Sequence, residues 1–178
     1  MKILVDADSC PKAARELVIR RAAKLSLCVV FAANRPIPGV KRENSSLDYA
    51  LSAAENVIME ICPVLDNSAD DRIVELAESG DIAVTRDIPL AKRLIEKNVI
   101  TLDDRGRVFT QNNINEFLSL RNFMTGLADN GLEIQRTANY GRKELKTFAD
   151  SLDKILARFL KRVYSPEDRF YALNASGY

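Results

Sequence analysis

Histidine is absent from the 178 residues of this chain. Its absence excludes Ser-His-Asp and Cys-His catalysis, zinc sites with histidine ligands, and acid-base chemistry by an imidazole near neutral pH. Any catalysis must therefore use carboxylates, hydroxyls or a thiol.

Cysteine is scarce. The three cysteines, Cys10, Cys28 and Cys62, are widely spaced, odd in number and form no Cys-x-x-Cys pair. This pattern argues against a disulfide framework and a structural zinc site, and it favours a reducing compartment. We interpret Cys10 as structural, because no histidine can act as its base and acidic neighbours oppose a thiolate.

Long apolar runs and a charge excess are also missing. No apolar stretch approaches the roughly 20 residues that span a bilayer, and no cleavage-site pattern follows the N-terminus. We therefore expect a soluble, cytoplasmic protein without a membrane partner. Lys and Arg total 26 against 25 Asp and Glu, so the chain lacks the large excess of positive charge that indicates nucleic-acid binding. Nucleic acid is not excluded as a partner.

Apolar, β-branched runs alternate with helical patterns, and 47% of the residues are hydrophobic, enough for a proper core. This rhythm predicts an α/β fold: a single domain with a mainly parallel five-stranded sheet and helices on both faces. The predicted strands are 2–5, 27–33, 56–64, 81–85 and 99–102. The predicted helices between them are 12–25, 46–53, 69–78 and 88–97.

The rhythm changes after Leu102. Residues 103–107 have turn composition, and the short run 108–110 with a polar stretch after it predicts a hairpin or turn before a helix at 114–127. We divide the chain into an α/β domain at 1–128, a linker at 129–141, an amphipathic helix at 142–163 and a tail at 164–178. The amphipathic helix either docks on the domain or pairs with a partner, so it could form a homo-oligomer.

Acidic residues follow several of the predicted strands. If the first strand persists through Asp8, the carboxylates of Asp6 and Asp8 project from the same face. In a parallel sheet the others meet at the same edge, where ligands bind in open α/β sheets. Clustered carboxylates imply Mg²⁺ or Mn²⁺, or shared protons. The acidic residues at this edge are Asp6, Asp8, Asp70, Asp71, Asp87, Asp103 and Asp104.

Most of these residues also have a structural interpretation. Asp87 precedes Ile88 and Pro89 in an N-cap arrangement, and Asp70 and Asp71 suit the start of a helix. Asp103 and Asp104 lie in turn composition. Asp6 is harder to explain structurally, because a carboxylate at the end of a buried strand needs a hydrogen-bond partner or a cation.

Four segments, 5–11, 69–74, 80–91 and 105–114, resemble the YaiI/YqxD family of uncharacterised bacterial proteins. That family is regarded as similar to PIN-like domains, which include metal-dependent ribonucleases. The resemblance implies a PIN-like fold with Asp6, Asp70 and Asp87 in the places of its acidic residues, and Asp8 and Thr85 as close support. It favours Asp70 over Asp71, because the second residue of that pair is often not acidic in the family pattern.

We therefore predict a ribonuclease-like hydrolase that depends on Mg²⁺ or Mn²⁺ and acts on RNA or another nucleic acid. Asp6, Asp70 and Asp87 are the predicted catalytic residues and, with Asp8, the metal ligands. The residues predicted to support the site or to bind phosphate are Thr85, Arg86, Asp71, Asp103 and Arg105. For the arginines, ion pairs with the acidic cluster are an equal alternative.

Two other functions stay open. One is a PIN-like module that binds RNA or a protein without catalysis. The other is a phosphatase similar to the haloacid dehalogenase superfamily, with Asp6 as nucleophile and Asp8 as general acid. In that superfamily the acidic pair follows the threonine motif, whereas here Asp70-Asp71 precedes Thr85.

Overall fold

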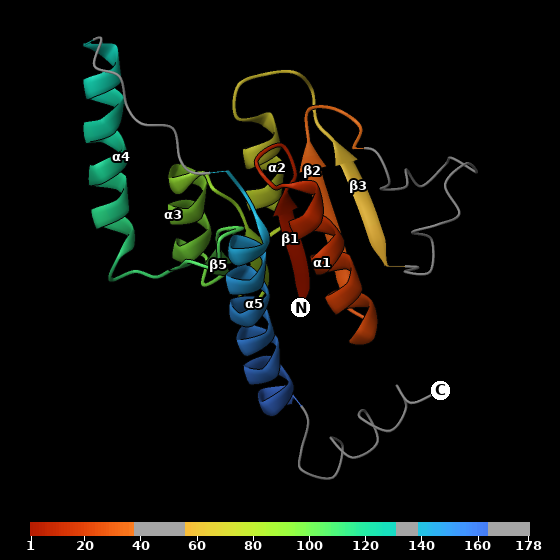
Figure 1. Ribbon diagram of the computed structural model, residues 1–178. Helices are drawn as coiled ribbons and strands as arrows, with labels where there is room; N and C mark the ends of the chain where they lie inside the picture. Colours follow the sequence, from red (N-terminus) through yellow and green to blue (C-terminus); the bar gives the residue numbers. More distant parts are fainter. Residues whose placement is uncertain (38–55, 131–138, 164–178) are drawn as a thin grey trace.

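The computed structural model describes residues 1–37, 56–130 and 139–163 (Figure 1). Six strands lie between helices in three layers. The strands are β1 (Lys2–Asp6), β2 (Cys28–Ala33), β3 (Val57–Ile61), β4 (Ile82–Val84), β5 (Ile100–Leu102) and β6 (Val108–Phe109). The helices are α1 (Lys12–Lys24), α2 (Ser68–Leu76), α3 (Ile88–Glu96), α4 (Ile114–Asp129) and α5 (Arg142–Val163).

The sheet has the order β3-β2-β1-β4-β5-β6. The first five strands in this order are parallel, which confirms the predicted α/β fold and its five parallel strands. The short β6 adds an antiparallel strand to β5, because the turn at residues 103–107 folds the chain directly back. The helix predicted at 46–53, most of the linker and the tail lie outside the described residues.

Alternating residues of the buried strands supply two cores, one on each face of the sheet. Ile3 and Val5 of β1 point into a core shared with α1 and α5, which we call the α1/α5 core. Leu4 points to the other face, into a core shared with α2 and α3. Because β1 is apolar on both faces, it lies at the centre of the sheet with a helical layer on either side.

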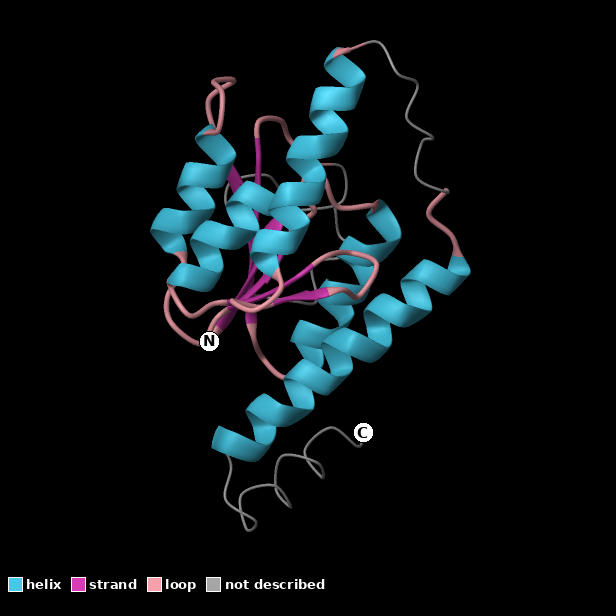
Figure 2. Cartoon of the chain, turned by 90° about the vertical axis from the view of Figure 1, so that its left-hand side faces the viewer, coloured by secondary structure: helices cyan, strands magenta, loops and turns pink. Residues whose placement is uncertain are grey.

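Helix α5 begins and ends where the sequence predicts, and it docks on the domain (Figure 2). Its residues Phe148, Leu152, Ile155 and Leu156 are buried in the α1/α5 core. Asp153 accepts two hydrogen bonds from the Arg21 guanidinium of α1, at 2.7 and 2.9 Å. The helix is therefore part of the domain's core, and assembly of a homo-oligomer through its remaining surface stays a prediction.

Helix α4 stands apart from the sheet, on the outer side of α3 (Figure 1). Its first residue, Ile114, packs with Phe109 and with Ala91 and Ile95 of α3. Further along, Leu120 is 55% exposed and Phe123 is 63% exposed. Only the beginning of α4 is therefore anchored in the core.

The three cysteines are unpaired thiols. Cys10 is buried, and this burial, helped by the charge of Asp104, raises the pKa of its thiol to about 12. A thiol with such a pKa is protonated at neutral pH, in agreement with a structural role. Within the described ranges, no helix has the length and apolar character needed to cross a membrane.

Gly106 is where the turn between β5 and β6 touches α5, and replacing it with alanine should destabilise the fold by about 2 kcal/mol. Its φ is +85°, and an added Cβ would lie 2.5 Å from the Thr147 carbonyl oxygen. Gly80 is the control, because its φ is +87° but no atom lies within 4 Å of an added Cβ. Gly80→Ala should therefore cost only about 1 kcal/mol in urea denaturation. Equal losses of stability in the two variants would show that α5 accommodates the added methyl group at no cost.

Candidate functional site

The strand order reverses between β1 and β4, since β2 and β3 lie to one side of β1 and β4, β5 and β6 lie to the other. In open α/β sheets the crevice beyond the carboxyl ends of the strands at such a switch point is where ligands bind. At this edge, β1 ends with Asp6, and the loop between β4 and α3 carries Thr85 to Asp87. In Figure 1 the arrowheads of β1 and β2 mark this edge of the sheet.

Asp6 lies at the end of β1 with 7% of its surface exposed. One carboxylate oxygen, Oδ2, accepts hydrogen bonds from the Ser9 hydroxyl at 2.6 Å and from the Thr85 hydroxyl at 2.8 Å. The Thr85 oxygen in turn accepts a hydrogen bond from the backbone N–H of Asp87 at 3.0 Å. These bonds connect the end of β1 to the start of α3 and hold the Asp6 carboxylate in place.

Asp87 is the N-cap of α3, as the sequence indicates. Its Oδ1 accepts a hydrogen bond from the Leu90 N–H at 2.8 Å, and Pro89 occupies the first turn of the helix. This structural role accounts for part of the carboxylate's bonding capacity. It also orients Asp87 towards the same edge as Asp6.

Asp70 lies in the first turn of α2, and its pKa is raised to about 6. The largest cause is burial, followed by the negative charges of Asp87 and then Asp6, while Arg93 opposes the shift. Asp70 of α2 therefore lies close enough to Asp6 and Asp87 for their negative charges to act on its carboxylate. The neighbouring Asp71 is not part of this group of carboxylates, because it forms an ion pair with Arg93 of α3 at 2.7 Å.

Asp8 does not project beside Asp6. Strand β1 ends at Asp6 and the chain turns directly after it, so Asp6 and Asp8 do not lie on one strand and do not share a face. The Asp8 carboxylate accepts a hydrogen bond from the Asn34 N–H at 2.9 Å and pairs with Arg35 at 3.6 Å. The Ser68 hydroxyl donates to the Asn34 side chain at 3.0 Å. Asp8 thus ties the loop after β1 to the loop after β2.

Arg86 forms an ion pair with Asp104, a carboxylate that is only 1% exposed. The guanidinium uses two of its nitrogens for this contact, and it lies 5.9 Å from the ring centre of Tyr140. The Tyr140 hydroxyl donates to the Asp104 carbonyl oxygen at 2.9 Å. Of the two interpretations of Arg86, the ion pair with the acidic cluster is the one that this geometry shows.

Asp103 and Arg105 belong to the turn between β5 and β6. The Asp103 carboxylate accepts hydrogen bonds from the backbone N–H groups of Arg105 at 3.0 Å and Arg107 at 2.8 Å. Burial raises the pKa of Asp103, although these two bonds act in the opposite direction. The role of Asp103 here is to close the turn.

Sequence reasoning missed Ser9 and Tyr140 as parts of this edge, and it placed Asp104 there without identifying Asp104 as the partner of Arg86. The spacing Asp6-x-x-Ser9 is a signal for Ser9, because an aspartate that begins a turn commonly bonds to the residue three positions later. Tyr140 gives no such signal, because it falls in a segment with linker composition. No signal separates Asp104 from the adjacent Asp103 as the partner of Arg86.

The donors at this edge fit Mg²⁺ or Mn²⁺ in kind, since all are carboxylate or hydroxyl oxygens. In the present arrangement of side chains, no three carboxylates or thiols of the described residues are close enough to hold one ion. Binding would therefore require Asp70 and Asp87 to turn towards Asp6.

Asp70→Asn should stabilise the metal-free fold at pH 7 by on the order of 1 kcal/mol, after allowance for solvent screening. The folded state holds the Asp70 proton up to a pKa of about 6, whereas the unfolded chain releases it near pH 4. Stability contributed by this proton is complete below pH 4 and is lost as the pH rises to about 6. Urea denaturation in EDTA at pH 4.5 and pH 7 measures the effect as the difference between the variant and the native chain.

The matched control is Asp71→Asn, which removes an exposed ion pair and should change stability by less than about 0.5 kcal/mol at both pH values. The measured quantity is the difference in stability between the native chain and Asp70→Asn. If this difference is the same at pH 4.5 and at pH 7, the raised pKa of Asp70 is contradicted.

Comparison with known proteins identifies uncharacterised relatives. The profile described as "Uncharacterized BCR, YaiI/YqxD family" matches residues 4–158. A UPF0178 protein of Treponema denticola is 44% identical over 162 residues, which cover 91% of this chain and 96% of the relative. Those of Treponema pallidum and Pseudomonas aeruginosa are 43% and 40% identical, over 90% and 89% of this chain and 84% and 91% of the relatives. No solved structure matches the chain.

Proposed function

The chain belongs to the YaiI/YqxD family of uncharacterised proteins, and we propose that it is a divalent-metal-dependent phosphodiesterase that cleaves RNA or another nucleic acid. The observation that carries the proposal is the position of Asp6, Asp70 and Asp87 at the switch point of the sheet, where the negative charges of Asp6 and Asp87 act on Asp70. Carboxylates in such a position are stabilised by a cation. The choice of RNA rests on the resemblance of the family to PIN-like domains.

Each residue of the site has a defined task in this proposal. Asp6, Asp70 and Asp87 would hold Mg²⁺ or Mn²⁺, directly or through water. When bound, such an ion supplies an activated water and compensation for the charge that develops on the phosphodiester. The hydroxyls of Ser9 and Thr85 fix the Asp6 carboxylate, so this ligand loses little freedom on binding. The absence of histidine is no obstacle, because this chemistry needs none.

The phosphatase alternative has one observation in its favour, the hydrogen bond of 2.8 Å between Thr85 and Asp6. In that chemistry Asp8 would donate a proton beside Asp6. The structure instead bonds Asp8 to Asn34 and Arg35, on the side of β2. The phosphodiesterase is therefore the better supported of the two enzymes, and trapping of fluoroberyllate on Asp6 would reverse that order.

The test measures Mn²⁺ binding by calorimetry and cleavage of labelled single-stranded RNA, each with the full chain. We expect saturable binding, and cleavage that requires Mg²⁺ or Mn²⁺ and stops in EDTA. Asp70→Asn should reduce cleavage about 100-fold, because it removes a ligand charge, whereas Asp71→Asn should stay within about twofold.

Two results would count against the proposal. Absence of both Mn²⁺ binding and cleavage across RNA and DNA substrates would remove its basis. RNA affinity that is unchanged by EDTA and by Asp70→Asn, without cleavage, would identify a binding module instead.

A further inference from the structure

A cavity lies at the opposite edge of the sheet from the carboxylates. Its volume is about 730 Å³, and it lies between α5 and the amino ends of three strands. Met1 precedes β1, Gly80 precedes β4 and Ile100 begins β5, and all three line it. At about 3.3 Å per strand residue, the length of β1 separates this cavity from Asp6 by roughly 16 Å. The cavity is therefore not part of the site already described.

The floor of this cavity is apolar. Besides Met1 and Ile100, it is lined by Val108 of β6 and by Ile155 and Phe159 of α5. Ile100 is 39% exposed, although it lies on a strand of the sheet. Cavities of about 300–1,000 Å³ with mostly apolar walls are typical of sites for small organic molecules. The floor thus offers an apolar surface of suitable size for a hydrocarbon chain or a ring system.

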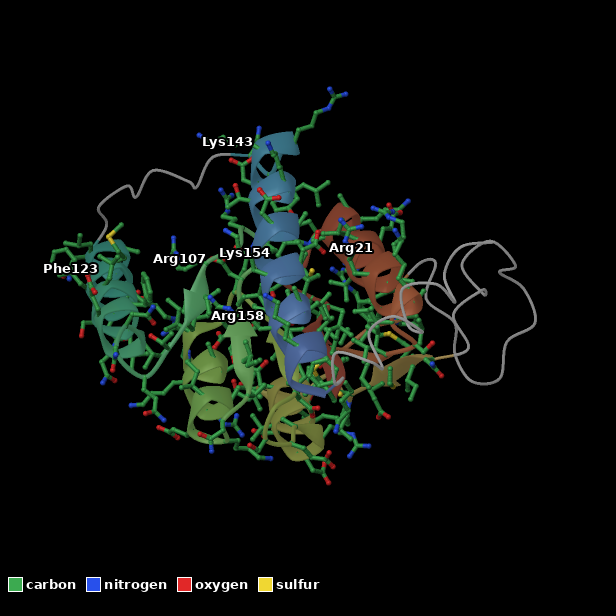
Figure 3. All side chains as sticks on the ribbon, turned by 90° about the horizontal axis from the view of Figure 1, so that it is seen from below. Arg21, Arg107, Phe123, Lys143, Lys154 and Arg158 are labelled. Carbon is green, nitrogen blue, oxygen red and sulfur yellow. The ribbon has the colours of Figure 1, made fainter. Side chains whose placement is uncertain are left out.

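The rim of the cavity is cationic. Lys154 and Arg158 line it from α5, one helical turn apart (Figure 3). Like charges at this spacing repel each other. Neither residue forms an ion pair with an acidic side chain of the described ranges. The two acidic residues next to the Ser79-Gly80 wall, Glu78 and Asp81, both pair with Lys2, at 3.2 and 3.0 Å.

We propose that this cavity binds a small amphipathic anion. The apolar body of the ligand lies against Ile100, Ile155 and Phe159, and its acidic group, a carboxylate, sulfonate or phosphate, pairs with Lys154 and Arg158. Charge complementarity favours this class of ligand, because neither of the two cations at the rim forms an ion pair with a described acidic residue. The Ser151 hydroxyl is not free for the ligand, since it donates to the Gly106 carbonyl oxygen at 2.8 Å.

The probe for the test is 8-anilino-1-naphthalenesulfonate, which combines an aromatic body with one sulfonate and fluoresces in apolar sites. Titration of the folded, full-length chain should show one saturable site. Lys154→Glu and Arg158→Glu should each weaken binding at least about tenfold. Lys143→Glu is the matched control, because Lys143 is exposed on the first turn of the same helix and does not line the cavity, and it should leave the affinity unchanged.

Two further experiments test the proposal. The first distinguishes recognition of the negative charge from non-specific hydrophobic binding, and the second tests whether binding is independent of the carboxylate site. N-phenyl-1-naphthylamine has the same rings without the sulfonate, so its affinity should not differ between the native chain and Arg158→Glu. Asp6→Asn and EDTA should not alter sulfonate binding, whatever their effect on cleavage. Sulfonate binding at the cavity and nuclease activity at the carboxylates are therefore tested independently, and failure of one leaves the other unaffected.

Three outcomes would overturn the proposal: no saturable binding of the sulfonate, equal sulfonate affinity in the native chain and both charge-reversal variants, or a dimer in light scattering that Arg158→Glu dissociates. The last result would identify the cavity as an interface between two copies of the chain.

Discussion

Replacing Arg86 with alanine is expected to lower the free energy of unfolding by about 3 kcal/mol, because it leaves a buried carboxylate without its counter-charge. Asp104 is only 1% exposed, and its carboxylate is bonded to two nitrogens of Arg86. The expected loss lies at the lower end of the usual range for buried pairs, because 41% of the Arg86 side chain is exposed. Urea denaturation at pH 7 in EDTA measures it.

Two variants make this result specific. The double variant Arg86→Met with Asp104→Leu removes both charges, and its stability should return to within about 1 kcal/mol of the native value. Arg107→Ala removes a looser and more exposed pair, at 3.8 Å from Asp103, and should cost less than about 1 kcal/mol. A loss of the same size in Arg86→Ala and Arg107→Ala would mean that the burial of Asp104 carries no special cost.

Asp6→Asn should reduce metal-dependent cleavage of RNA by on the order of 1,000-fold while the chain stays folded. The substitution removes one negative charge but keeps the shape of the side chain and an oxygen that can accept the bonds of Ser9 and Thr85. Mn²⁺ affinity, measured by calorimetry on the same sample, should fall with the activity. Circular dichroism and urea denaturation check that the fold is unchanged.

Asp8→Asn is the matched control for Asp6→Asn, because the two residues are of the same type and lie two positions apart. Asp8 is bonded to the loop after β2, so its replacement should change cleavage less than about fivefold. A larger loss in Asp8→Asn than in Asp6→Asn would favour an Asp8-centred acid or metal site and would overturn our assignment of Asp6.

The arrangement of strands and helices could be predicted because the local and global signals agree. Ile3, Leu4 and Val5 are apolar on both faces of β1, as the central strand of a covered parallel sheet requires. The sequence from Thr85 to Pro89 contains an N-cap and a proline at the helix start, and Asp87 caps α3 in the structure. These features depend on neighbours in the sequence, which pattern analysis can read.

The pairing of side chains at the candidate site could be predicted only in part. Asp6, Asp70 and Asp87 meet at the same edge because parallel strands and the helices after them place them there. Asp8 would share the face of Asp6 only on a strand that continues to Asp8, whereas β1 ends at Asp6 and Asp8 bonds to Asn34. Arg86 and Asp104 lie 18 residues apart, and no local pattern selects Asp104 over Asp103 as the partner.

The position of α5 in the α1/α5 core has a consequence for synthesis of the protein. Phe148 and Leu152 complete the α1/α5 core around Ile3 and Val5, so residues from the two ends of the described chain must meet before this core closes. A nascent chain that has left the ribosome only as far as α4 exposes the sheet face that α5 later covers. That intermediate offers an apolar surface to chaperones and to other nascent chains, and the last step of folding waits for the emergence of α5.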